Sequence, residues 1–285
     1  MKKLFALTFI FSSCAFGAPK LVEVQNEREL TVEQLAKTIA SNQTHFILGE
    51  YHYNEQIQKA QGEFIELMTR NLQMEGQVTT GWEFLNYKDH DKLELLFDKY
   101  SNNQLTIDEL LIQMMGEKNI SENMKYAPIF KATKNINGQF IALNETREVK
   151  RYITTGGIEN LPSEYLPPNY MKGSDQYLIR FKEVMGGHTD SESLKKYFDA
   201  QAFTDSVMAY QFEQQAINPL RFTVVGSFHS DYFDGLIREQ IRTSNDHKII
   251  SIKVVDKNSM TKKEWSELFD SSKYGKIADY ILYLE

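Results

Sequence analysis

The stretch "FILGEYHYNE" (residues 46–55) decides how the rest of the chain is read. Its apolar run, 46–48, is followed by Gly49, and then by a carboxylate, an aromatic ring and an imidazole at Glu50, Tyr51 and His52. A short apolar run of this kind is typical of a strand that is buried on both faces. The sequence therefore places an acid and a histidine where a buried strand ends.

Further segments share this strand-like character, and helical patterns lie between them. The five predicted strands are "HFILG" (45–49), "VTTGWEF" (78–84), "QFIALN" (139–144), "RFTVVGSF" (221–228) and "KIISIKVV" (248–255). Strands that alternate with helices predict an α/β fold, in which a mostly parallel central sheet is flanked by helices. Two long helical insertions, 85–138 and 145–220, are expected to cap the carboxyl edge of the strands.

The N-terminus has the pattern of an export signal. Lys2 and Lys3 precede an apolar run that is too short to span a bilayer, and Ala15-Phe16-Gly17 then offers small residues at the two positions that a signal peptidase reads. Two outcomes stay open: cleavage after Gly17, or lipidation at Cys14, the only cysteine of the chain. We therefore expect a signal peptide at 1–17, a single domain at 18–285, and an exported protein, periplasmic or anchored as an outer-membrane lipoprotein, in a Gram-negative bacterium.

The composition excludes several classes of protein. The 285 residues are 41% hydrophobic and 25% charged, which is typical of a globular protein. The net charge is −7, and it becomes −9 if residues 1–17, with two lysines and no acids, are removed. An acidic chain without basic clusters argues against nucleic acid and against anionic membrane surfaces as partners.

Polar side chains follow four of the predicted strands directly. In an open parallel sheet, ligands bind at the carboxyl edge of the strands, so we expect these side chains to converge on one site. The pattern Gly-x-x-His occurs twice, at 49–52 and 226–229, each time after a strand. The residues expected at the site are Glu50, His52, Glu83, Asn144, Arg147 and His229.

One helical segment adds two candidates. In "AQAFTDSVMAYQFEQQ" (200–215), Phe203, Val207 and Tyr210 form an apolar stripe, and Gln201 and Asp205 lie one turn apart on a neighbouring face. That pair either points at the same sheet edge or lies on an exposed face, and spacing alone leaves both open.

The order of these motifs resembles the ChaN family of haem-binding lipoproteins. The matching segments are "ILGEYH", "GWEF", "KYAPIFKATKNINGQFIALNETREV", "YFDAQAFTDSVMA" and "VVGSFH", within residues 44–240. The wider group to which that family belongs includes erythromycin esterase-like enzymes and metal-dependent Wnt-cleaving proteases. The resemblance implies the α/β fold described above, haem as the ligand and a role in haem or iron acquisition; a homodimer is a further expectation.

The chain departs from the family pattern on the first helix. Tyr53 replaces an acid, and Ile57 and Gln58 occupy the positions of a histidine pair, whereas Asn144 and Arg147 are kept. The resemblance and the strand ends together give the expected haem-binding set: Tyr51, His52, Asn144, Arg147, Gln201, Asp205 and His229. Because the histidine pair is missing, we expect ferric haem to bind through an oxygen ligand or one imidazole.

Two other readings stay open. Glu50, His52, Glu83 and His229 could be the catalytic groups of a metal-assisted hydrolase, esterase- or peptidase-like, with His52, His229 and Glu83 holding zinc or manganese. His52 could also act as a general base without a metal. The third reading is a non-catalytic envelope protein whose site has decayed. Whether the site is catalytic is left open by the sequence.

Overall fold

A sheet of eight strands is the centre of the computed structural model, which describes residues 19–39, 43–168, 170–185, 190–244 and 246–284. The strand order is β2-β1-β8-β7-β3-β6-β4-β5. The strands are β1 (Lys20–Glu23), β2 (Arg28–Thr31), β3 (Thr44–Glu50), β4 (Val78–Asn86), β5 (Gln139–Asn144), β6 (Leu220–Gly226), β7 (Lys248–Val255) and β8 (Tyr280–Tyr283). The signal segment, with Cys14 and Gly17, lies outside the described residues.

All pairs among β3 to β8 are parallel, which confirms the predicted α/β architecture. The register pairs Glu50 of β3 with Gly226 of β6, and Gly49 with Lys253 of β7. Because these strands run in one direction, their carboxyl ends meet at one edge of the sheet. The polar residues that follow β3 and β6 are therefore neighbours in space.

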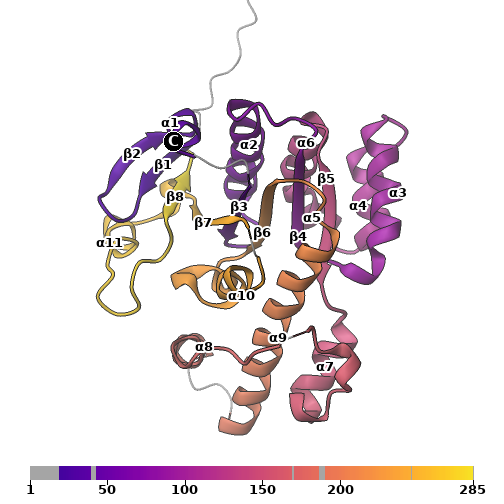
Figure 1. Cartoon of the computed structure of the whole chain (residues 1–285), viewed down its shortest axis with the longest axis vertical. Helices are drawn as coiled ribbons and strands as arrows, with labels where there is room; N and C mark the ends of the chain where they lie inside the picture. The colour runs from indigo at the N-terminus through magenta and orange to yellow at the C-terminus, as the bar shows by residue number, and fades with distance from the viewer. Residues whose placement is uncertain (1–18, 40–42, 169, 186–189, 245, 285) are drawn as a thin grey trace, which may run out of the picture.

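Helices cover both faces of the sheet, as Figure 1 shows. The helices are α1 (Val32–Thr38), α2 (Glu55–Asn71), α3 (His90–Ser101), α4 (Ile107–Met115), α5 (Ile120–Asn123), α6 (Ala127–Asn135), α7 (Arg147–Gly156), α8 (Asp175–Met185), α9 (Ser191–Gln215), α10 (Gly235–Thr243) and α11 (Lys262–Glu267). No helix within the described ranges is long and apolar enough to cross a bilayer.

Alternation along the strands divides the core between the two faces. Phe46 and Leu48 of β3 pack with α1, α2 and α6, whereas Ile47 packs with Phe212 of α9 and Ile237 of α10. Successive side chains of a strand point to opposite faces, so a strand covered on both sides must be apolar throughout. This is why the sequence shows an unbroken apolar run here.

The insertion at 145–220 forms a helical layer that reaches beyond the sheet (Figure 1). The long helix α9 carries it, with α7 packed on one side through Ile153 and α8 on another through Phe181. The first half of α9, together with α8, covers the carboxyl edge of the strands, as expected from the sequence. In the insertion at 85–138, Tyr126 reaches the same edge.

Two helix starts are fixed by the capping residues that the sequence offers. Thr31 and Gln34 form a reciprocal capping box at the start of α1. The side chain of Asn54 accepts hydrogen bonds from the backbone N–H groups of Gln56 and Ile57 at the start of α2. The second cap ends the loop that carries Tyr51, His52 and Tyr53.

Candidate functional site

Close packing at the ends of β3 and β6 explains the two glycines of the Gly-x-x-His patterns. A Cβ atom on Gly226 would lie 2.8 Å from Nε2 of His52 and 3.4 Å from Oε2 of Glu83. A Cβ atom on Gly49 would collide with the side chain of Ser230. Only a residue without a side chain lets these groups approach the backbone so closely. The glycines thus bring the residues after β3, β4 and β6 together.

Glu50 is the buried acid of the first pattern, with 2% of its surface exposed. Its Oε1 accepts a 2.7 Å hydrogen bond from the hydroxyl of Tyr126 and lies 3.0 Å from Nδ1 of His52. Its Oε2 accepts a 2.8 Å bond from the amide of Gln58. Three partners from three segments satisfy the carboxylate, as a buried charge requires. Glu50 therefore orients the His52 ring.

His52 lies at the boundary between this buried group and solvent. Its side chain is 36% exposed, and its ring centroid lies 4.7 Å from that of Phe84. Burial opposes protonation, but the hydrogen bond that His52 donates to Glu50 and the charge of Glu83 outweigh it and raise the pKa of His52 above its ordinary value. The Nε2 side of the ring faces Gly226 and Glu83.

Glu83 is a second buried carboxylate, held between the two histidines. The backbone N–H of Gly226 donates a 2.5 Å hydrogen bond to its Oε2, and its Oε1 lies 3.4 Å from Nε2 of His229. Burial alone would raise the pKa of Glu83, but His229, His52 and the Gly226 N–H together lower it to about 2. Glu83 is therefore ionised at neutral pH.

His229 is buried between two carboxylates. Its Nδ1 lies 2.5 Å from Oδ1 of Asp205, while its Nε2 faces Glu83. Burial lowers the pKa of His229, but Asp205 and Glu83 more than reverse this and raise it to about 10. Burial also raises the pKa of Asp205, against the opposing effect of His229. The close contact and the value of about 10 lead us to describe the pair as imidazolium and carboxylate at neutral pH.

Two further side chains hold the His229 pair in place. The hydroxyl of Tyr177 donates a 3.0 Å hydrogen bond to Oδ2 of Asp205. The amide of Gln201 lies 3.1 Å from the Tyr177 hydroxyl and 3.0 Å from Nδ1 of His229. The pair that the sequence left open, Gln201 and Asp205, therefore points at the sheet edge and does not lie on an exposed face.

A cavity of about 810 Å³ opens over these groups. It is lined by Glu50, Tyr51, His52, Glu83, Arg180, Phe181, Glu183, Val184, Gln201, Gly226, Ser227, Phe228, His229, Asp231, Tyr232 and Tyr274. Its floor is ionic, whereas its rim carries exposed apolar surface: the side chains of Tyr51 and Val184 are 62% and 70% exposed. The cavity therefore offers two different environments to a ligand.

Most of the predicted site residues meet at this cavity, but three, Asn144, Arg147 and Asp205, do not line it. The Asn144 side chain accepts hydrogen bonds from the backbone N–H of Glu145 and from Lys150, and Arg147 is exposed at the start of α7. Arg147 contributes instead to the electrostatic environment of Tyr53 and Lys150. Asp205 lies behind His229 and supports it.

Sequence reasoning missed Tyr126, Tyr177 and Lys150. Nothing in their local pattern marks them, because they reach the site from the insertions. Burial lowers the pKa of Lys150, which lies within the electrostatic range of Glu83. Gln58 was read only as a lost histidine, yet its amide holds Glu50. The sequence does offer a clue to this contact: Gln58 lies one helical turn after the capping residue Asn54, so its side chain belongs to the first turns of α2.

The metal set predicted from the sequence is not supported. Across the described ranges, no group of three or more His, Cys, Asp or Glu side chains is arranged to hold a metal ion. The physical reason lies in the pairing of the imidazoles with carboxylates. Nδ1 of His52 faces Glu50, and the two nitrogens of His229 face Asp205 and Glu83, so these atoms are engaged with one another.

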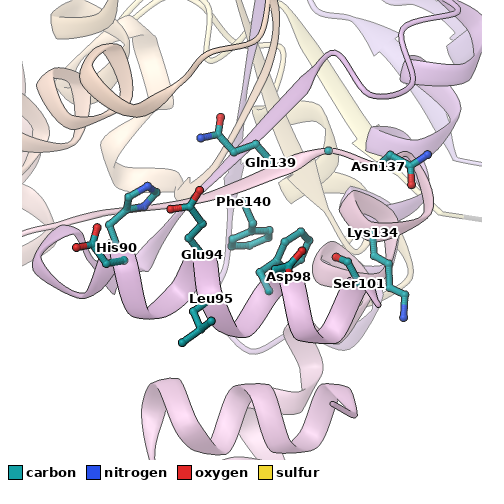
Figure 2. Close-up of a pocket in the computed structure, with 12 residues that line it drawn as sticks. His90, Glu94, Leu95, Asp98, Ser101, Lys134, Asn137, Gln139 and Phe140 are labelled. Atoms are coloured by element: carbon teal, nitrogen blue, oxygen red, sulfur yellow. The ribbon is translucent and has the colours of Figure 1, made fainter. Parts of the chain in front are cut away.

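A second large cavity, of about 620 Å³, lies far from these groups. It is formed by α3 and the amino end of β5, and Figure 2 shows Glu94 projecting from α3 toward Gln139. Because it opens at the amino end of a strand, it is at the opposite edge from the two histidines. None of the predicted site residues lines it. We therefore place the candidate site at the carboxyl edge.

Comparisons with known proteins agree with this fold. The solved structure of ChaN of Campylobacter jejuni, described with cofacial haem binding, is similar with a TM-score of 0.66 and 16% identity, over 94% of this chain and 97% of that one. The type III effector HopBA1 has a TM-score of 0.47 and 9% identity, over 88% and 91% of the two chains. The RRSP toxin effector domain of Vibrio vulnificus has a TM-score of 0.41 and 14% identity, over 79% of this chain and 36% of that one. The last two scores are too low to support any argument.

No curated protein matches the sequence. The family model for haem-binding uptake proteins of the Tiki superfamily, ChaN, matches residues 36–239, which is well over half of the chain. The match spans β3 to α10 and so contains every side chain of the cavity floor described above. The chain therefore belongs to the ChaN family of haem-binding uptake proteins.

Proposed function

We propose that this protein is exported and binds ferric haem at the rim of the 810 Å³ cavity, for haem acquisition or handling in the bacterial envelope. The family membership supports haem as the ligand. The observation that carries the proposal is the exposed aromatic and aliphatic surface at the cavity mouth, at Tyr51 and Val184. A porphyrin needs an apolar surface to cover and one axial ligand, and exposed apolar surface beside a cavity often marks a binding site.

Tyr51 is the best placed axial ligand. Its side chain is the most exposed of the three candidates Tyr51, His52 and Tyr53, and of the two tyrosines it alone lines the cavity. Tyr53, 41% exposed, packs against Phe84 and Tyr126. A phenolate oxygen is an established ligand of ferric haem. The proposed ligand, Tyr51, thus lies between Glu50 and His52 in the first Gly-x-x-His pattern.

Bis-imidazole ligation does not fit the two histidines. His229 is 8% exposed and its ring nitrogens face Asp205 and Glu83. His52 has its Nδ1 against Glu50 and its Nε2 against Gly226. Moving either ring onto iron would leave a buried carboxylate without its partner, which is costly. The apolar wall with Phe181 and Val184 is the surface that the porphyrin would cover instead.

Haemin titration of the mature protein tests this proposal. We expect a saturable change in the Soret band, a phenolate-to-iron charge-transfer band and a high-spin ferric signal in electron paramagnetic resonance. Tyr51→Phe should remove the charge-transfer band. Tyr152→Phe is the matched control, because Tyr152 is also a half-exposed tyrosine but lies on α7, where its hydroxyl donates to the backbone of Asn160. A low-spin bis-imidazole spectrum would show that the ligation is wrong.

Export and membrane attachment are part of the proposal and rest on the sequence of residues 1–17. The basic start, the apolar run and the small residues support a signal peptide. Cys14 supports a lipid anchor as the alternative to cleavage after Gly17. A homodimer remains a prediction, and its test is the mass of the haem-loaded protein by light scattering.

A second function is favoured by one observation, the pairing of each histidine with a buried carboxylate over an open cavity. His52 with Glu50 has the arrangement of a general base and the group that orients it. The ionised Glu83 and the charged His229 beside it could stabilise charge in a hydrolytic reaction. Chromogenic esters and peptides test this reading. Activity that is lost in His52→Gln, with no haem bound, would replace the haem proposal.

A further inference from the structure

A lysine is buried beneath the exposed ring of Tyr51. Lys253 lies on β7 and has 2% of its surface exposed. Its Nζ atom lies 2.7 Å from Oδ2 of Asp231 and 4.7 Å from the centroid of the Tyr51 ring. An ammonium at this distance from an aromatic ring is attracted to it by the ring quadrupole. Lys253 therefore connects the β7 strand to the proposed haem ligand.

The position of this lysine needs an explanation, because stability alone does not favour it. Its neighbours on β7, Ile252 and Val254, are fully buried apolar residues. Replacing a buried ion pair by well-packed apolar residues is often neutral or stabilising for a fold. Lys253 and Asp231 thus carry a desolvation cost at a place where an apolar pair would serve the core at least as well.

Tyr51, whose ring contacts Lys253, lies between two cavities. Tyr51, Asp231 and Tyr232 line both the 810 Å³ cavity and a neighbouring cavity of about 410 Å³, which Lys253 also lines. A side chain that is 62% exposed between two open spaces is not fixed by packing alone. The Lys253 contact supplies the missing constraint on the ring.

We infer that Lys253, held in place by Asp231, is a positioning residue that orients the Tyr51 ring for binding to haem iron. This inference rests on the proposed function, because it assumes that Tyr51 is the axial ligand. The ammonium fixes the ring face, and its charge lies over the ring that carries the oxygen ligand. Asp231 offsets part of this charge, so the orientation of the ring is the main effect.

The test uses variants that separate orientation from folding. Lys253→Met alone would leave the Asp231 carboxylate, which is only 13% exposed, without its lysine, so the paired variant Lys253→Met/Asp231→Asn keeps the site neutral and foldable. Lys253→Arg keeps the charge and the contact with a ring face. The matched control is Lys257→Met: Nζ of Lys257 lies 4.5 Å from the Trp265 ring and 4.2 Å from the Tyr283 ring, which is the same kind of contact at another place.

Each protein is loaded with haemin, and two quantities are measured: the iron–phenolate stretch by resonance Raman, and the rate of haem transfer to apomyoglobin. In the paired variant we expect a shifted and broadened stretch and haem loss about fivefold faster, as removal of a cation–π contact implies. Lys253→Arg should restore the wild-type band, and Lys257→Met should match the wild type.

The outcomes distinguish this inference from the proposed function. If the wild type shows no phenolate signal, the haem proposal fails at the first step, and the inference fails with it. If the wild type shows the signal and the folded paired variant keeps the same band, Lys253 does not position Tyr51. Faster haem loss with an unchanged band would likewise overturn the inference, because it would indicate a structural role only.

Discussion

Nδ1 of His229 lies 2.5 Å from Oδ1 of Asp205, and the two residues come from a strand end and from the long helix α9. This contact joins the helical insertion to the sheet edge at the floor of the cavity. It also makes His229 a charged group in a buried place, because Asp205 and Glu83 together raise its pKa to about 10 against the effect of burial. The first two predictions follow from this pair.

His229 should carry protons on both ring nitrogens at neutral pH. Since its pKa is about 10, nitrogen-15 NMR of the imidazoles should show the imidazolium form from pH 6 to about pH 9. In Asp205→Asn the largest charge that raises this pKa is gone, so the neutral form should appear at lower pH. A control away from this site is His90→Gln, at the start of α3, which should leave the His229 signals unchanged. A neutral His229 at pH 7 in the wild type would contradict the assignment.

The same pair predicts how stability depends on pH. The folded pKa of about 10 lies above the ordinary value of 6.5, so the imidazolium stabilises the folded state fully below about pH 6.5 and less as the pH rises toward 10. The free energy of unfolding of the wild type, minus that of Asp205→Asn, should therefore fall between pH 6.5 and 10, by on the order of a few kcal/mol. Urea unfolding at several pH values measures this difference; a gap that widens in this range would refute it.

Tyr126 supports the other histidine through Glu50, and its hydroxyl should be worth a measurable amount of stability. Tyr126→Phe removes the 2.7 Å bond to Glu50 and leaves the carboxylate with His52 and Gln58. A hydrogen bond to a buried charged group contributes about 1.5–3 kcal/mol. We expect a loss of this size in urea unfolding. Tyr100→Phe is a control on the same face of the sheet, away from the site.

How far the sequence predicts this fold depends on where each element lies. The central strands are recognisable because both of their faces are buried, as in Phe46, Ile47 and Leu48. The strands β1, β2 and β8 were not predicted. Each has four residues, and their pairing joins Lys20 to Tyr283 across the whole length of the chain, which no local pattern records.

The site shows the same limit. The convergence of Glu50, Glu83 and His229 was predictable, since it follows from parallel topology alone. The supporting hydroxyls of Tyr126 and Tyr177 were not, because they depend on how the insertions fold back. The metal set was the misleading part: two histidines near carboxylates fit a metal site by residue type, but the structure pairs them with those carboxylates.

Processing of the N-terminus is predicted from residues 1–17. Intact mass of the protein isolated from a Gram-negative envelope should show either loss of residues 1–17 or a diacylglyceryl group on Cys14. Cys14→Ser distinguishes the two outcomes, because it abolishes lipidation but leaves cleavage after Gly17 unaffected. Unmodified full-length protein in the cytoplasm would rule out export.

Gly226→Ala should separate the haem reading from the hydrolase reading. The added Cβ would lie 2.8 Å from Nε2 and 2.9 Å from Cε1 of His52, so the ring must move. The ring has room to do so, because 36% of the side chain is exposed. If haem binds at the rim through Tyr51, its affinity should change by less than about threefold, which is under about 1 kcal/mol. If His52 is instead a general base, activity should fall by about 10²-fold or more, because a base must be within hydrogen-bond reach of its proton.

Gly156→Ala is the matched control, since the nearest atom to its Cβ would be 4.0 Å away, in the Tyr152 ring. Haem affinity that collapses in Gly226→Ala, but not in Gly156→Ala, would place the porphyrin on the cavity floor, against His52, and not at the rim.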